Sequence, residues 1–154
     1  TLCARVFPAA ALAMDRPNPR NALGTALLSS ATACADISDG LAQDLGHILE
    51  RSGVDADVLW DAVPKHPALA ALSQEQQVEA ARSGGDDYEL VFTAPADKRG
   101  LIEQASISAL TPVTRIGRIV EKKPSGAPLA IRDASGRPLF LPVQGFDHFA
   151  QSAD

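Results

Sequence analysis

At 154 residues, with a net charge of -5 and 45% hydrophobic residues, the chain has the size and composition of one soluble globular domain. Its basic residues are scattered, so the positive surface that a phosphate backbone requires is missing, and we expect no nucleic-acid partner. The apolar opening segment is interrupted by Arg5 and Pro8 and is too short to span a bilayer, so no membrane association is expected. Cys3 and Cys34 form no CxxC pair, which favours a reducing compartment and predicts a cytoplasmic protein.

The first predicted elements lead toward an acidic motif. The two prolines of RPNPR fix an extended entry, and Asn21 is a candidate cap for the helix that follows. Residues 29–35 are small and apolar, which is typical of a buried approach, and this approach ends at Asp36. We therefore expect a carboxylate at the edge of the core.

The middle of the chain alternates between helices and strands. Apolar residues at helical spacing predict a helix that starts at residue 41 and ends at Gly53. Alternation predicts strands over 54–60 and 88–93, with Asp55 on the face of the first strand opposite its apolar residues. Between them, Ser73 followed by Gln76 matches a capping box and opens another helix.

The final predicted elements complete an α/β (α+β) fold. They are a helix over 97–107, a strand over 113–120 and a hairpin over 129–141. Because helices and strands are interleaved, we expect a mixed β-sheet with helices packed on it, in a single domain over 1–154.

The stretch ACADISDGL carries the first chemical signal. Asp36 and Asp39 flank Ser38, and clustered carboxylates require either water or a positive partner. Mg²⁺ typically takes one or two carboxylates together with water and substrate phosphates, while Ser38 and free N–H groups near Gly40 can donate to phosphate. The alternative is that Ser38 or Asp39 simply caps the next helix. Since a cap leaves Asp36 unexplained, the pattern favours a metal or phosphate site.

Two further segments leave alternatives open. SGGDDYEL, which contains Asp86, is either a polar turn after a helix or part of a binding site, and the two readings are even. Strand alternation prevents all of its acids from pointing into one site. In the closing GFDHF, Phe146 and Phe149 are most simply packed into the core, with an aromatic wall for a ring ligand as the alternative.

Taken in order, RPNPRNALG, DISDGLAQDLGHIL, SGGDDYELVFTAP and GFDHF resemble the C-terminal half of the thiamine-monophosphate kinases. That family is related to aminoimidazole ribonucleotide synthetase, selenophosphate synthetase and a hydrogenase maturation factor. The resemblance implies a C-terminal α/β domain like that of aminoimidazole ribonucleotide synthetase. It also implies a separate N-terminal domain, absent from this chain, that carries most ATP and Mg²⁺ ligands and the contact of a homodimer.

The activity that this resemblance implies is transfer of the ATP γ-phosphoryl group to thiamine monophosphate, giving thiamine diphosphate. On the matching positions, Asp36 and Asp39 are expected to bind Mg²⁺ and Ser38 the nucleotide. Asp86 is expected to contact thiamine monophosphate, and Phe146 to lie against its ring. The domain alone should be inactive. The alternatives are a related ATP-dependent enzyme with another acceptor, or a non-catalytic module that binds a metal-phosphate ligand.

Overall fold

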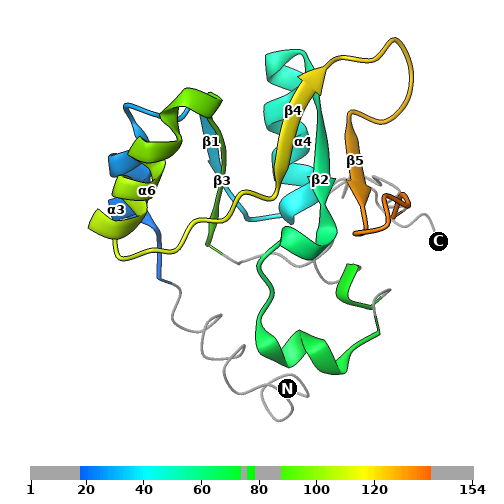
Figure 1. The fold of residues 1–154 in the computed structure, drawn as a ribbon, viewed down its shortest axis with the longest axis horizontal. Coiled ribbons are helices and arrows are strands. Elements are labelled where there is room, and N and C mark those ends of the chain that lie inside the picture. The colour runs from blue at the N-terminus through cyan, green and yellow to red at the C-terminus, as the bar shows by residue number, and fades with distance from the viewer. Residues whose placement is uncertain (1–17, 74–75, 79–87, 140–154) are drawn as a thin grey trace, which may run out of the picture.

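Two small sheets and the helices around them make up the part of the chain that the computed structural model describes, residues 18–73, 76–78 and 88–139 (Figure 1). The helices and strands are α3 (Asn21–Leu27), β1 (Ala33–Asp36), α4 (Leu41–Ser52), β2 (Val54–Leu59), β3 (Leu90–Thr93), α6 (Arg99–Ser108), β4 (Gly117–Glu121) and β5 (Leu129–Arg132). Short 3-10 turns lie at Trp60–Ala62, Pro67–Ala71 and Ala96–Lys98. Within the described ranges, no helix has the length and apolar character needed to cross a membrane.

The strands form an antiparallel pair and a mixed three-stranded sheet. β1 pairs with β3, and their ladder runs from Ala33 opposite Thr93 to Asp36 opposite Leu90. In the other sheet, β2 is central, antiparallel to β4 and parallel to β5. The predicted mixed sheet with packed helices is confirmed, and β1 with β3 forms a separate pair beside it.

Helix α4 lies between the two sheets (Figure 1) and holds the main core together. Its apolar stripe includes Leu49, which is completely buried. The core that this stripe forms with β2, β3, β5 and neighbouring segments comprises Leu45, Ile48, Leu49, Ala56, Val58, Trp60, Val78, Val91 and Ile131. The amphipathic pattern therefore places α4, and the loop that leads into it, against a rigid support.

Helices α3 and α6 form a second core on the other face of the β1–β3 pair. Leu23 and Leu27 of α3 meet Ala105 of α6, and Leu90 and Phe92 of β3 pack against them. The residue between these two on β3 belongs instead to the main core, because successive strand residues point to opposite faces. The pair β1–β3 is thus supported by helices on both faces.

Several local predictions are confirmed. Gly53 ends α4 with a left-handed φ of 64°, and the strand that follows covers Val54–Leu59. The capping box is present, since Ser73 N–H donates to Gln76 Oε1 at 3.0 Å and Gln76 N–H donates to Ser73 Oγ at 3.3 Å. The predicted strand over 88–93 is present as Leu90–Thr93.

Three predictions are wrong in detail. Asn21 does not cap α3, because the N-cap is Arg20 and no side chain makes a capping bond there. Residues 29–35 are not a buried approach, because strand β1 alternates between half-buried and exposed residues and leaves both Cys34 and Asp36 exposed. The strand predicted over 113–120 begins only at residue 117, because its partner β2 ends at residue 59.

The expected hairpin over 129–141 is confirmed within the described residues, which extend to 139. β5 runs to Arg132, which bridges to Pro138 after a turn. Asp133 closes that turn, with Gly136 N–H donating to its carbonyl oxygen at 2.9 Å. The side chain of Asp133 also accepts bonds from the Ser135 N–H and hydroxyl, which lowers the pKa of this carboxyl below its ordinary value.

Candidate functional site

The β1–β3 pairing places DISDG beside the described end of the second acidic motif, residues 88–90. Asp36 at the end of β1 lies opposite Leu90 at the start of β3. One residue further, Ile37 N–H donates to the Glu89 carbonyl oxygen at 2.8 Å. The chain that enters DISDG therefore lies beside the chain that leaves SGGDDYEL, although about fifty residues separate the two motifs.

A third motif is attached at the same place by an ion pair. Arg20, the last residue of RPNPR, donates from Nε to Glu89 Oε2 at 3.0 Å and from a terminal nitrogen to Oε1 at 2.5 Å. The hydrogen bond to Glu89 raises the pKa of the Arg20 guanidinium, and this charge-assisted bond is stronger than one between neutral groups. The described parts of three of the four motifs thus meet at the Asp36 end of the β1–β3 pair.

The predicted metal ligands and the predicted nucleotide contact are all accessible there. Asp36, Ser38 and Asp39 are exposed and follow one another from the end of β1 into the loop before α4. Within the described residues, neither carboxylate forms an ion pair. Two accessible carboxylates fit Mg²⁺, which commonly takes its other ligands from water and phosphate. The described residues contain no group of three or more His, Cys, Asp or Glu side chains placed to hold a metal.

The capping alternative for Ser38 and Asp39 is wrong. Helix α4 begins at Leu41, its N-cap is Gly40, and no side chain makes a capping bond. Gly40 has a φ of 112°, which favours glycine because a side chain would clash in that conformation. The exposure of Asp36 also removes the expectation that burial forces it to have a partner; instead it leaves the carboxylate open to a ligand.

The sequence reasoning missed the residue that supports this loop. Asp44, in the first turn of α4, is only 6% exposed, and its Oδ2 accepts the Ser38 N–H at 3.0 Å and the Asp39 N–H at 3.1 Å. A signal was present, because Asp44 stands three residues after Leu41 on the apolar stripe of the helix. An acidic residue on a buried face indicates a polar partner.

The pairing of Arg20 with Glu89 was also missed, and the sequence carries no local signal for it. Their separation is 69 residues, so only the tertiary fold brings them together. Tyr88, just before Glu89, has a positive φ of 53°, an uncommon conformation for a bulky residue. The chain therefore enters β3 through a backbone bend next to the ion pair.

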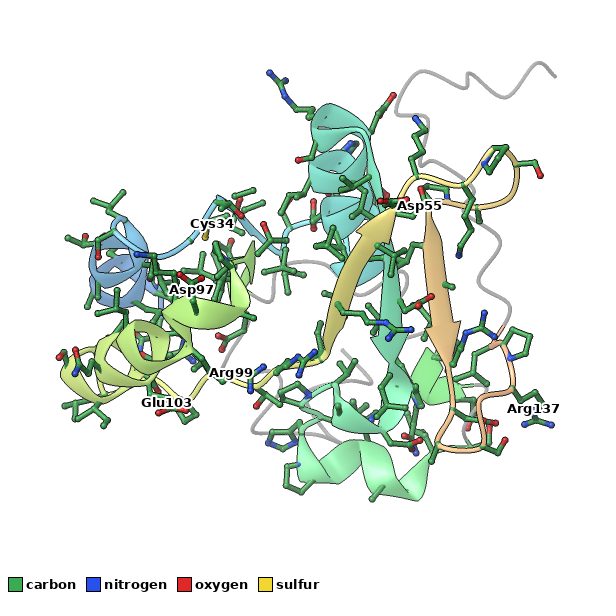
Figure 2. All side chains as sticks on the ribbon, turned by 45° about the horizontal axis from the view of Figure 1, so that its top comes forward. Cys34, Asp55, Asp97, Arg99, Glu103 and Arg137 are labelled. Carbon is green, nitrogen blue, oxygen red and sulfur yellow. The ribbon has the colours of Figure 1, made fainter. Side chains whose placement is uncertain are left out.

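Cys34 lies two residues before Asp36 on β1 and is labelled in Figure 2. Although Cys34 is exposed as a residue, partial burial of its sulfur raises the pKa of the thiol, and the negative charge of Asp36 adds to this. A thiol with a raised pKa is mainly protonated at neutral pH and is a poor nucleophile. The raised pKa therefore disfavours a covalent role for Cys34.

The site is open rather than enclosed by the described residues. Two hollows, of about 320 and 460 Å³, lie elsewhere on this part of the surface. Neither includes Asp36, Ser38 or Asp39 among its lining residues. The predicted substrate contacts Asp86 and Phe146 lie outside the described residues, so their roles stay predictions.

The sequence model of the family described as AIR synthase related protein, C-terminal domain, matches residues 10–128, well over half of the chain. The chain belongs to this family. Curated relatives of this AIR synthase related domain include the thiamine-monophosphate kinase of Haemophilus influenzae, which is 42% identical over 139 residues. The match covers 89% of this chain and 42% of that protein. The thiamine-monophosphate kinase of Escherichia coli K12 is 40% identical over 136 residues, which are 88% of this chain and 41% of the relative.

Solved structures agree with the sequence relatives. Thiamine-monophosphate kinase from Stenotrophomonas maltophilia superposes on this AIR synthase related domain with a TM-score of 0.74 at 40% identity, covering 88% of this chain and 41% of the other. AaThiL, solved in complex with AMPPCP and TMP, has a TM-score of 0.64 at 27% identity over 86% of this chain and 41% of its own. The hydrogenase maturation protein HypE of Escherichia coli, at 18% identity and a TM-score of 0.61 over 78% of this chain and 38% of its own, shares the fold. The chain spans about two fifths of the length of the relatives that it matches.

Proposed function

We propose that this chain is the C-terminal domain of a kinase that phosphorylates thiamine monophosphate. In the proposed reaction, a phosphate oxygen of thiamine monophosphate attacks the γ-phosphorus of ATP. The bond from that phosphorus to the β–γ bridging oxygen breaks, and thiamine diphosphate and ADP are the products. The single observation that carries the proposal is the meeting of the described parts of three sequence motifs at the Asp36 end of the β1–β3 pair.

The similar proteins support the same substrate pair. Relatives at 40–42% identity over almost nine tenths of the chain are thiamine-monophosphate kinases. AaThiL was solved with AMPPCP, an ATP analogue, and with TMP. In this chain, the start of the exposed loop after β1 lies beside Glu89 and Leu90, which supports an arrangement in which the loop binds the nucleotide end and the motif before β3 the acceptor.

The catalytic problem in such a transfer is to align two anionic reactants and to offset their repulsion. Mg²⁺, when bound, would supply the compensating charge. In our proposal Asp36 and Asp39 hold that ion and Ser38 contacts the nucleotide, while Asp86 and Phe146 contact thiamine monophosphate. The exposed positions of Asp36, Ser38 and Asp39 support their parts of this assignment.

The remaining ligands belong to residues beyond those that the structure describes. The described residues supply two accessible carboxylates and no larger metal-binding group. We propose that an N-terminal domain of the same protein completes the ATP and Mg²⁺ site, that the full-length protein is a homodimer, and that it works in the cytoplasm. The relatives are about two and a half times as long as the matched segment, which leaves room for such a domain.

The test is ATP-dependent formation of thiamine diphosphate by the full-length protein, with Asp36→Asn compared with Asp97→Asn. Both substitutions replace an exposed carboxylate by an amide of the same shape. Asp97, labelled in Figure 2, lies on the 3-10 turn after Thr93, at the opposite end of the β1–β3 ladder from Asp36. The control therefore changes the same charge on the same part of the fold, away from the site.

We expect product from the wild type and from Asp97→Asn, and a loss of at least about a hundredfold in Asp36→Asn, because one metal-ligating charge is missing. Absence of thiamine diphosphate from folded wild-type protein that binds ATP would exclude the thiamine acceptor. Equal activity of the two variants would exclude Asp36 from the metal site.

A further inference from the structure

A buried carboxylate attaches the loop between β1 and α4 to its helix, in addition to the bonds that the Gln43 and Asp44 N–H groups donate to the Gly40 carbonyl oxygen. Oδ2 of Asp44 accepts the N–H groups of two consecutive loop residues, Ser38 at 3.0 Å and Asp39 at 3.1 Å. Asp44 itself is 6% exposed and stands on the helix face that enters the main core beside Leu45. The support for the loop therefore comes from behind it, out of reach of solvent.

Burial of a carboxylate is unfavourable unless hydrogen bonds replace its lost hydration. Within the described residues, Asp44 forms no ion pair, so the two backbone N–H groups are the compensation that the structure shows. An apolar residue at this position would leave the N–H groups of Ser38 and Asp39 without this acceptor. The carboxylate therefore fixes the geometry of the loop as well as extending the buried face of α4.

The same two bonds decide what the loop can offer a ligand. Because the N–H groups of Ser38 and Asp39 point back to Asp44, they are not available to a phosphate. What these residues still offer a ligand is oxygen: Ser38 with its hydroxyl and Asp39 with its carboxylate are exposed, as is Asp36 three residues before Asp39. A set of oxygen ligands suits a hard cation rather than an anion.

We propose that Asp44 is a positioning residue for the metal-binding carboxylates of the loop, an inference that rests on the proposed function. By fixing the backbone at Ser38 and Asp39, it holds the Asp39 carboxylate at a constant distance from Asp36, which is itself fixed by the β1–β3 ladder. Residues that orient metal ligands from behind typically change metal affinity by about 10- to 100-fold when they are removed.

The experiment measures binding of Mn²⁺, as a paramagnetic substitute for Mg²⁺, to the full-length protein in the presence of AMPPCP, by electron paramagnetic resonance. It needs neither thiamine monophosphate nor turnover. The variants are Asp44→Ala, which removes the acceptor, and Asp44→Asn, whose amide oxygen can accept the same two N–H groups. The control is Asp55→Ala on β2, labelled in Figure 2, at the far end of α4 from the loop.

Asp55 is a close match for Asp44, since it is 3% exposed and its Oδ2 accepts one backbone N–H, that of Lys123, at 2.9 Å. We expect Asp44→Ala to weaken Mn²⁺ binding about tenfold or more, Asp44→Asn to stay within about threefold of wild type, and Asp55→Ala to bind Mn²⁺ as wild type does. Hydrogen exchange of the peptide that contains Ser38 and Asp39 should accelerate in Asp44→Ala alone.

Wild-type Mn²⁺ affinity in Asp44→Ala would overturn the proposal, as would an equal loss in Asp55→Ala, which would indicate general destabilisation. A loss in Asp44→Asn as large as in Asp44→Ala would show that the charge acts directly and would also overturn it. If Asp44→Ala does not fold, Asp44→Glu replaces it, because the added methylene displaces the acceptor; unchanged affinity there would again contradict the proposal. The kinase assay could also fail while the Mn²⁺ affinities of the variants follow the expected pattern. That outcome would reject the proposed function and leave Asp44 as the positioning residue.

Discussion

We predict that the ion pair between Arg20 and Glu89 stabilises the junction at which the three motifs meet. Substitution Arg20→Ala removes both bonds of the guanidinium to the Glu89 carboxylate. Glu89 also accepts the Ile37 N–H through its carbonyl oxygen, so its backbone position controls the start of the DISDG loop. Loss of the ion pair should therefore loosen the bond at Ile37, which lies outside the ion pair itself.

The magnitude follows from the exposure of the pair. The side chains of Arg20 and Glu89 are 27% and 48% exposed, so water screens the attraction, and surface pairs contribute only about 0.2–1 kcal/mol. Because the guanidinium binds the carboxylate through two hydrogen bonds (bidentate geometry), we place this pair at the upper end of that range, about 1 kcal/mol. Since 1.4 kcal/mol corresponds to a factor of ten, we expect the opened form of the junction to become about fivefold more populated.

Hydrogen exchange of the Ile37 amide in the full-length protein measures that population, because the amide exchanges when its bond to Glu89 opens. We expect Arg20→Ala and Glu89→Ala to accelerate the exchange about fivefold each, and the double variant to add little. The matched control is Arg118→Ala, which removes an ion pair to Asp57 in the other sheet at 3.1 Å. That variant should leave exchange at Ile37 unchanged.

Two results would refute the reasoning. Unchanged exchange at Ile37 in Arg20→Ala would show that the ion pair does not hold the junction. Fully additive effects of Arg20→Ala and Glu89→Ala would show that the two residues act independently. The charge-swapped double variant, Arg20→Glu with Glu89→Arg, provides a further check. It should restore part of the wild-type protection of the Ile37 amide against hydrogen exchange.

Three further predictions concern stability, measured by urea unfolding. Leu49→Ala should lower the free energy of unfolding by about 2–5 kcal/mol because Leu49 is fully buried, whereas Leu28→Ala, at 82% exposure, should change it by less than about 0.5 kcal/mol; similar losses would contradict the assigned core. Gly117→Ala should cost more than about 1 kcal/mol, because its Cβ would lie 2.3 Å from a carbonyl oxygen of β2, and an unchanged midpoint would refute that contact. The hydrogen bond from the Ser135 hydroxyl lowers the pKa of Asp133 in the folded state. The ionised Asp133 carboxylate therefore stabilises the fold above its unfolded-state pKa of about 3.9, and this stabilisation is lost as the pH falls through the folded-state pKa. Asp133→Asn should therefore flatten the loss of stability below about pH 4, and an identical pH profile would contradict this.

Signals that act within one turn or one strand were predictable from the sequence. Gly53 ends its helix in the conformation that glycine favours, and Ser73 and Gln76 form their reciprocal bonds. Their outcome depends on neighbours a few residues away, which the sequence displays directly. The order of helices and strands, and with it the fold class, follows from the same local patterns.

What depended on distant partners was not predictable. Alternation placed Asp55 on the strand face opposite the apolar residues, but nothing local indicated that it is 3% exposed and accepts the N–H of Lys123, 68 residues away. The importance of Asp36 was predicted for a partly wrong reason, since it is exposed rather than buried. Its neighbourhood with Glu89 exists only because β1 pairs with β3.

The candidate site also combines features that the sequence indicated with features that only the structure shows. Residue types in DISDG indicated a cation, and the exposed carboxylates of Asp36 and Asp39 support this proposal. The hydrogen bonds that Asp44 accepts from the loop could be recognised only in the structure, because the sequence does not show which way a backbone N–H group points. Asp86 and Phe146 remain predictions from the family resemblance.

The most direct test of the central claim is to locate the metal in crystals of the full-length protein grown with Mn²⁺, AMPPCP and thiamine monophosphate, using the anomalous scattering of Mn²⁺. We predict an anomalous peak coordinated by the carboxylates of both Asp36 and Asp39, between the nucleotide phosphates and the loop before α4. A fully occupied nucleotide site whose metal ions contact neither carboxylate would contradict the account.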